Sequence, residues 1–133
     1  MKIAYTKLYT VDKQAEALVF YTKKLGFVVQ TDKMFEAYRW LTLVSPDDRD
    51  GAAIMLDPND TPEIRAFLNM RDRYVSAATF VVTDVYAEAK RLTDLGIELV
   101  DTPTWFGDYK FISFYDPCGN LIELMQTENL ATF

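Results

Sequence analysis

The order of apolar and polar positions predicts a strand, a helix and three further strands in the first half of the chain. Residues 3–11 alternate loosely between apolar and polar side chains, which is typical of a strand. Apolar residues then recur at helical spacing between Asp12, whose side chain we expect to cap the helix, and Gly26, a typical helix end. Three strand-like runs follow, at residues 27–31, 38–45 and 52–56.

The second half repeats this order of elements. A polar stretch with a helix start at Thr61-Pro62-Glu63 separates the halves and predicts a linking helix within residues 58–75. Residues 77–82 are typical of a strand, Asp84 of a helix cap, and Leu95-Gly96 of the end of that helix. Three more strands are predicted, at residues 97–101, 110–115 and 121–126.

The repeat predicts an α+β fold of two βαβββ modules, at residues 1–57 and 76–128. We expect their mixed sheets to pair and enclose a cup, with the helices on the outside. At 133 residues the chain is long enough for one domain with a real core, so residues 1–133 are expected to form a single domain.

Composition and charge exclude several classes of function. The net charge is −6 and no basic run is present, which argues against nucleic acid and anionic membranes as partners. No apolar run approaches the ~18 residues of a membrane span. The first residues do not resemble a signal peptide and the single Cys118 cannot form an internal disulfide, so a cytoplasmic location is expected. The chain has no histidine, which excludes Ser-His and Cys-His nucleophilic mechanisms.

Two motifs carry a resemblance to a known family. The first combines Val11-Asp12, Phe20-Tyr21 and Leu25-Gly26-Phe27, and the second is DPCGNLIEL at residues 116–124. In this order they resemble the vicinal oxygen chelate superfamily, which includes glyoxalase I, extradiol dioxygenases and the fosfomycin and bleomycin resistance proteins. Residues 39–42 and 118–121 further resemble a glyoxalase-like branch of it. The resemblance covers nearly the whole chain and implies the paired βαβββ modules.

The resemblance also locates the positions that bind metal in the superfamily's metalloenzymes. They fall at Tyr5, Met55, Ala77 and Glu123, where such enzymes carry His or Glu. Asp57, the nearest other carboxylate, is expected beyond the end of its strand. One carboxylate beside a phenol, a thioether and a methyl group is not a ligand set for zinc, magnesium or manganese. We therefore expect no metal and no other cofactor, which argues against glyoxalase, dioxygenase and metal-dependent epimerase activity.

Glu123 stands alone as a charge in an otherwise apolar strand. A buried carboxylate without a partner is costly, so it should be paired or protonated. In a structural role, it accepts a hydrogen bond from Tyr5 or pairs with Lys7 or Arg39. In a functional role, it receives a polar or cationic ligand or acts as a base. The sequence leaves both roles open.

Other side chains are expected to line the cup. Ser113 and Tyr115 face it if Ile112 and Phe114 face the helix layer. An aromatic loop at residues 105–109 would sit near its mouth, where its rings receive a planar or cationic guest, fill a dimer interface or plug the cup. Alternation does not decide whether Arg39 or Trp40 points inward. The candidate lining is therefore Tyr5, Lys7, Arg39, Met55, Ala77, Trp105, Ser113, Tyr115 and Glu123.

These features favour a metal-free small-molecule binding protein, resembling the bleomycin-type resistance proteins that hold a ligand without chemistry. The alternative is a metal-independent lyase or isomerase. In that case Glu123 is the general base and Tyr5 or Arg39 stabilises the developing oxyanion. The resemblance also implies a homodimer.

Overall fold

The computed structural model describes residues 1–70 and 74–128. The chain divides into two compact units. The first contains the elements from β1 to α2 together with Pro117–Gly119, and the second contains the elements from β5 to β8. In the described residues, no helix combines the length and the apolar composition needed to cross a membrane.

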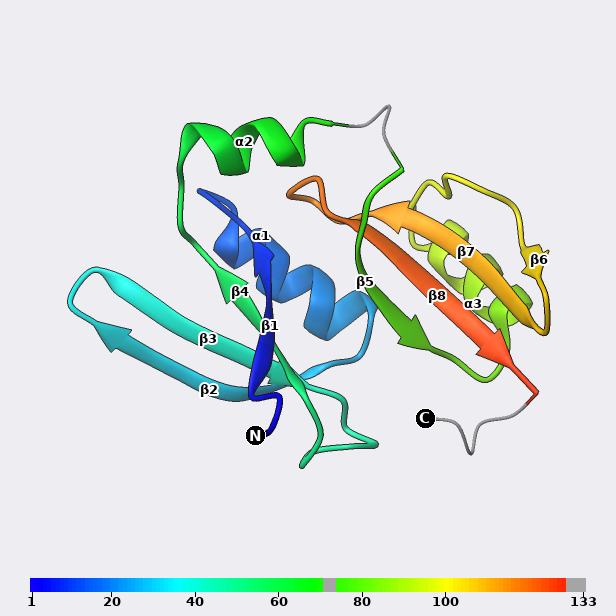
Figure 1. The fold of residues 1–133 in the computed structure, drawn as a ribbon, viewed down its shortest axis with the longest axis horizontal. Coiled ribbons are helices and arrows are strands. Elements are labelled where there is room, and N and C mark those ends of the chain that lie inside the picture. Colours follow the sequence, from blue (N-terminus) through cyan, green and yellow to red (C-terminus); the bar gives the residue numbers. More distant parts are fainter. Residues whose placement is uncertain (71–73, 129–133) are drawn as a thin grey trace. The chain divides into compact units, whose positions relative to one another are not determined.

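The first unit is a four-stranded mixed sheet with two helices (Figure 1). Its strands lie in the order β1-β4-β3-β2, with β1 parallel to β4 and the other neighbours antiparallel. The helix α1 passes directly into one wider π-helical segment, η1. The elements are β1 (Tyr5–Tyr9), α1 (Gln14–Val19), η1 (Phe20–Lys24), β2 (Val28–Phe35), β3 (Tyr38–Val44), β4 (Ala53–Asp57) and α2 (Pro62–Leu68).

The second unit repeats this topology. Its strand order is β5-β8-β7-β6, again with the first two strands parallel and the others antiparallel. The repeated order confirms the predicted α+β fold of two βαβββ modules. The elements are β5 (Ser76–Val81), α3 (Val85–Asp94), β6 (Thr104–Phe106), β7 (Tyr109–Tyr115) and β8 (Leu121–Thr127).

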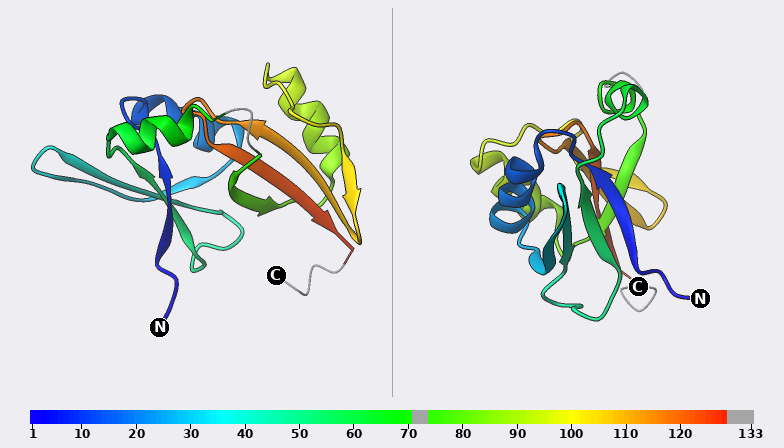
Figure 2. Two further views of the ribbon diagram at one scale, coloured as in Figure 1. Left: turned by 45° about the horizontal axis from the view of Figure 1, so that its top comes forward. Right: turned by 90° about the vertical axis from the view of Figure 1, so that its left-hand side faces the viewer.

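One helix packs against one face of each sheet, and this face holds the core (Figure 2). In the first unit, Tyr21 of η1 and Leu41 of β3 are fully buried. In the second, Leu92 of α3 is buried with Phe114 and Ile122 of the sheet. Burial of such side chains contributes about 1.5–3 kcal/mol each, which makes these helix-facing layers the main source of stability. The other face of each sheet carries mostly polar and aromatic side chains.

Four of the five predicted helix ends are confirmed. Thr61 caps α2 by accepting the backbone N–H of Ile64 at 3.1 Å, and Pro62 is the first helical residue. Asp84 caps α3 by accepting the backbone N–H of Ala87 at 3.1 Å. Gly26 and Gly96 follow their helices with φ of +86° and +84°, the left-handed conformation that glycine adopts without strain. The predicted cap at Asp12 is wrong. Val11 has φ +47°, which turns the chain so that α1 starts after Lys13, and no side chain among the described residues caps it.

The largest difference from the sequence prediction is the edge of the second sheet. Residues 97–101 form only an isolated bridge between Leu99 and Phe114, and the edge strand is β6 instead. The reason is a two-residue turn at Gly107-Asp108, with Gly107 at φ +62°, which folds Phe106 directly opposite Tyr109. The segment predicted as an aromatic loop is therefore mostly a β-hairpin.

Candidate functional site

An open pocket of about 790 Å³ lies on the face of the second sheet that is opposite α3. Half of its lining residues are aromatic: Tyr74, Trp105, Phe106, Tyr109 and Phe111. The rest of the lining comprises two carboxylates, two threonines and a methionine: Asp101, Glu123, Thr79, Thr104 and Met125. Phe106 is 77% exposed and Trp105 is 54% exposed, so the aromatic edge is accessible. This size is within the range of about 300–1,000 Å³ that is typical of small-molecule sites.

The strand register places Glu123 in this pocket. Ile122 and Leu124, its neighbours in β8, are buried on the helix side, so the two-residue period turns Glu123 to the opposite face. Its carboxylate accepts hydrogen bonds from the hydroxyls of Tyr74, at 3.2 Å, and Thr79, at 3.0 Å. In the described part of the second unit, these two hydroxyls are the hydrogen-bond partners of Glu123.

A second carboxylate lies beside the first. Ser113 faces Glu123 directly across the β7–β8 pair, and its buried hydroxyl donates to Asp101 at 2.9 Å. Burial raises the pKa of the Tyr74 hydroxyl, a hydrogen bond with Ser113 opposes that rise, and the charges of Glu123 and Asp101 add to it. Tyr74 therefore stays protonated at neutral pH and remains a hydrogen-bond donor to Glu123.

A buried lysine ties the edge strand to the helix on the other side of the sheet. The ammonium of Lys110 lies 4.2 Å from the ring centroid of Tyr86 in α3 and 4.1 Å from that of Trp105 in β6. Lys110 is only 7% exposed, so these cation–π contacts act with little screening by solvent. They hold Trp105 in place at the aromatic edge.

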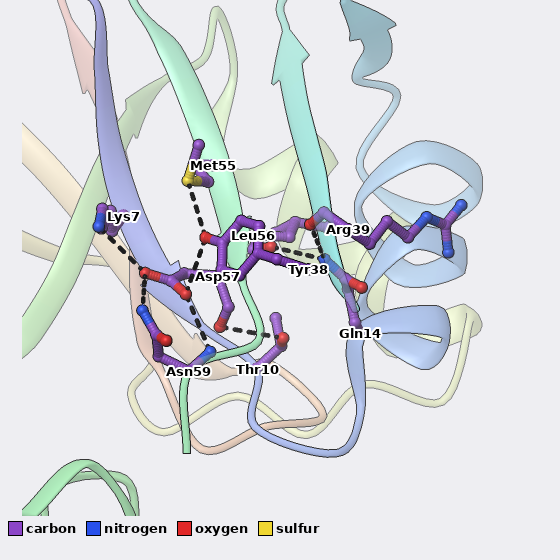
Figure 3. A network of polar contacts seen from close by, with 9 residues as sticks. All are labelled: Lys7, Thr10, Gln14, Tyr38, Arg39, Met55, Leu56, Asp57 and Asn59. Carbon is purple, nitrogen blue, oxygen red and sulfur yellow. Dashed lines mark hydrogen bonds and ion pairs between the residues drawn. The ribbon is translucent and has the colours of Figure 1, made fainter. Parts of the chain in front are cut away.

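The first unit carries a network around Asp57, the last residue of β4 (Figure 3). The Asp57 carboxylate is fully buried and lies 3.3 Å from the ammonium of Lys7. It also accepts the Tyr38 hydroxyl at 3.1 Å, and the backbone and side-chain N–H groups of Asn59 at 2.9 and 3.2 Å. The prediction that Asp57 lies beyond its strand is therefore wrong.

This network perturbs the acid–base properties of its members. Burial, together with the negative charge of Asp57, raises the pKa of Tyr38 to about 12. The hydrogen bond to Asp57 and its charge raise the pKa of Lys7 as well. Lys7 is therefore a charged partner of Asp57, and Tyr38 is a permanent donor at neutral pH.

A smaller pocket of about 470 Å³ lies on the same face of the first sheet, lined by Thr31, Lys33, Phe35, Tyr38 and Trp40. The Trp40 ring packs edge-on against Tyr5, with their centroids 5.5 Å apart. Arg39 lies on the other side of β3, where its guanidinium binds Asp32 through two hydrogen bonds of 2.9 and 2.8 Å. Trp40, and not Arg39, therefore belongs to this face.

Most of the candidate residues expected from the sequence lie on or beside the pocket face of their own unit. In the first, Tyr5, Lys7 and Met55 share the face with the smaller pocket. In the second, Trp105 and Glu123 line the larger pocket, and the hydroxyl of Ser113 donates a hydrogen bond to the lining residue Asp101. Ala77, at a bulge in β5, and Tyr115, at the end of β7, lie on this sheet without lining the pocket.

Several polar residues of these faces were not expected as site residues, among them Tyr38, Asp57, Tyr74, Thr79 and Asp101. Tyr74 follows the linking segment, where no periodic pattern gives its side chain a direction. Asp101 ends a run that does not form the predicted strand. The position of Asp57, two residues after Met55, was the available signal, because the two-residue period turns both side chains to one face.

The side chains at the positions that bind metal in the superfamily's metalloenzymes do not form a ligand set for a divalent metal ion. The Met55 sulfur accepts the Tyr38 hydroxyl at 3.5 Å, and Ala77 offers no donor atom. In residues 1–70 and 74–128, no three His, Cys, Asp or Glu side chains come together as a metal-binding group. Hard divalent ions require several oxygen ligands, and zinc requires three or four ligands from protein.

Comparisons with known proteins agree with the fold. A sequence model described as the Glyoxalase/Bleomycin resistance protein/Dioxygenase superfamily matches residues 2–124. The protein YurT of Bacillus subtilis (strain 168) is 39% identical over 127 residues, which cover 95% of this chain and 99% of YurT. The crystal structure of UcmS2 is 24% identical with a TM-score of 0.81, covering 96% of this chain and 98% of UcmS2. TnmS3, an antibiotic binding protein from Streptomyces sp. CB03234, is 23% identical with a TM-score of 0.76, covering 96% of this chain and 97% of TnmS3. The chain therefore belongs to the glyoxalase/bleomycin resistance protein/dioxygenase superfamily.

Proposed function

We propose that this protein is a metal-free binding protein for a small organic molecule, and that the ligand occupies the pocket around Glu123. The observation that carries the proposal is the pocket itself. It combines about 790 Å³ of open volume with five aromatic lining residues and two carboxylates. Small-molecule sites in general join a mostly apolar wall to a few placed polar groups.

Two further observations support a binding role. The superfamily and the fold are those of proteins that bind small molecules, and one structural neighbour is described as an antibiotic binding protein. The polar groups of the pocket are also already positioned, because Tyr74 and Thr79 hold Glu123 while Ser113 holds Asp101. Groups that are fixed before a ligand arrives lose less entropy on binding, so a preformed site favours affinity.

The test is native mass spectrometry on protein purified without chelator or added metal, before and after equilibration with 2-naphthylmethylamine. We expect no stoichiometric metal, a saturable 1:1 adduct, and recovery of the amine unchanged. Phe106→Ala should weaken the adduct, because this side chain stands at the rim of the pocket. Phe35→Ala is the matched control, since Phe35 is also exposed but lies in the first unit. A divalent metal that survives buffer exchange, or the absence of any saturable adduct, would refute the proposal.

A metal-independent lyase or isomerase is the second candidate. The observation in its favour is the contact between Glu123, a possible base, and the protonated Tyr74 hydroxyl, a possible acid, at 3.2 Å. Glu123→Gln separates the two functions. Loss of turnover with retained ligand affinity identifies a base, whereas loss of selectivity in binding identifies a ligand-recognition group.

We also propose that the protein acts as a cytoplasmic homodimer without nucleic-acid or membrane partners. The superfamily resemblance supports a homodimer. The net charge of −6, which repels nucleic acid and anionic lipid, argues against those partners. Size-exclusion chromatography with light scattering measures the oligomeric state. A mass equal to one chain across micromolar concentrations would refute the dimer.

A further inference from the structure

In residues 74–116 and 120–128 of the second unit, the cations lie away from the pocket. These cations are Lys90, Arg91 and Lys110. Lys90 and Arg91 lie on α3 and pair with Asp94 and Glu88 of the same helix, at 2.8 and 2.7 Å. Lys110 lies between the rings of Tyr86 and Trp105, on the helix side of the sheet. In these residues, therefore, no cation forms an ion pair with a pocket carboxylate.

The pocket carboxylates are held by hydroxyl groups instead. Glu123 accepts from Tyr74 and Thr79, and Asp101 accepts from Ser113. A hydroxyl satisfies a lone pair of a carboxylate but leaves its negative charge in place. Two such charges thus remain beside one pocket, and Glu123 is half-buried there. A cationic group brought by a ligand would complete this arrangement, because charge-assisted hydrogen bonds are about twice as strong as neutral ones.

The aromatic edge supplies the second half of the recognition. Phe106 pairs with Tyr109 across the hairpin, and Phe111 follows two residues later, so the three side chains share the face that carries Glu123. Their rings suit a flat apolar body, and ring faces also attract cations. The protein already shows this chemistry in one place, where Trp105 of the same edge strand holds the Lys110 ammonium at 4.1 Å.

We propose that the pocket selects an organic cation, namely a flat aromatic body that bears an ammonium or amidinium group. The body packs on Phe106, Tyr109 and Phe111, and the cationic group lies against Glu123 and Asp101. Tyr74, Thr79 and Ser113 are positioning residues that keep the carboxylates aimed into the pocket. This inference rests on the proposed binding function and adds the chemical class of the ligand to it.

Three compounds with the same ring test the charge preference: 2-naphthylmethylamine, which is a cation at pH 7, the neutral 2-naphthylmethanol and the anion 2-naphthoate. Equilibrium dialysis gives each dissociation constant without depending on the protein's own fluorescence. We expect the amine to bind about tenfold or more tightly than the alcohol, and the carboxylate to bind most weakly. Equal binding of all three would overturn the charge selection and leave the binding function standing. No binding of any compound at millimolar concentration would overturn both.

Variants then locate the preference. Glu123→Gln and Asp101→Asn should each reduce it, and the double variant should bind amine and alcohol within about twofold of each other. Asp94→Asn is the control, because it removes one negative charge from the exposed surface of α3. A preference for the amine that survives in the double variant, or that Asp94→Asn reduces equally, would overturn the inference. Alcohol binding retained by the double variant shows that it is folded, as does its melting temperature.

Discussion

Replacing Asp57 by asparagine removes the charge at the centre of the polar network of the first unit. The Asp57 side chain is fully buried and receives four contacts, from Lys7, Tyr38 and two N–H groups of Asn59. Asparagine keeps the shape but offers a single acceptor oxygen and turns an NH₂ group toward some of the same donors. At least one buried donor then loses its partner.

The size of the effect follows from these contacts. Hydrogen bonds to a charged group contribute about 1.5–3 kcal/mol each, but they are not additive and the amide replaces some of them. The Lys7 side chain is 42% exposed, so water takes over much of the solvation of its ammonium once the carboxylate is gone. We therefore expect Asp57→Asn to lower the free energy of unfolding by about 2–4 kcal/mol. This is a large part of the 5–15 kcal/mol that is typical of a domain.

Urea unfolding followed by circular dichroism measures the change, provided that the slope of the transition stays constant. Asp60→Asn is the matched control. Asp60 accepts two short hydrogen bonds from Arg65, at 2.7 and 2.6 Å, but both side chains are nearly half exposed. The control should barely move the urea midpoint, because solvent screens an exposed ion pair. If Asp57→Asn shifts the midpoint no more than Asp60→Asn, the argument that burial makes this network stabilising is wrong.

Three further predictions concern other parts of the fold. Gly119→Ala should lower the free energy of unfolding by more than about 2 kcal/mol, because Gly119 has φ +103° and a Cβ there would collide with the carbonyl oxygen of Leu68. Gly107→Ala, at φ +62° with open space around it, should lower it by about 1 kcal/mol. Equal losses in urea unfolding would contradict this. The pKa of Tyr38 is raised to about 12, so the stability that its protonated hydroxyl contributes is complete below the unfolded pKa of about 10 and is lost as the pH rises from 10 to 12. Tyr38→Phe should abolish this part of the loss. The measurement compares the free energy of unfolding against pH for the wild-type protein and the variant. Lys110→Met should lower the free energy of unfolding by about 1–2 kcal/mol, because it removes both cation–π contacts. In a Trp40→Phe background, which leaves Trp105 as the one tryptophan of the sequence, it should also shift the tryptophan emission to the red. An unchanged spectrum would refute the role of Lys110 in holding Trp105.

Local chemistry made most of the fold predictable. Strand-like runs located seven of the eight strands in the described residues, although several ends moved by one or a few residues. Two of the predictions that failed depend on more than local pattern. Asp12 has the chemistry of a cap, but the left-handed turn at Val11 carries its side chain away from the helix start. Residues 97–101 form a strand-like run, but the hairpin closed by Gly107 places β6 at that edge instead.

The site was less predictable than the fold. The closing motif singled out Glu123, and the hydrophobic strand around it signalled a carboxylate that needs partners. Alternation shows that Arg39 and Trp40 point to opposite faces of β3, but not which of these faces the core. The burial of Leu41 in the structure decides this. The partners of Glu123 could not be found in this way, because Tyr74 precedes its strand and Thr79 could be matched to Glu123 only once the β5–β8 register was known.

The contrast between Asp57 and Glu123 is the physical reason for assigning structure to one and function to the other. Asp57 is fully buried, carries its own counter-charge in Lys7, and accepts three hydrogen bonds, so it is saturated and needs nothing from a ligand. Glu123 is half-buried, faces an open pocket, and accepts two hydroxyl hydrogen bonds, and within residues 74–128 no cation balances its charge. A carboxylate holds up to about four acceptor sites, so Glu123 retains capacity for a donor from outside the chain. Hydroxyl groups that orient a carboxylate without neutralising it make a receptor for a cation, and we therefore expect Glu123, and not Asp57, to decide which ligands this protein binds.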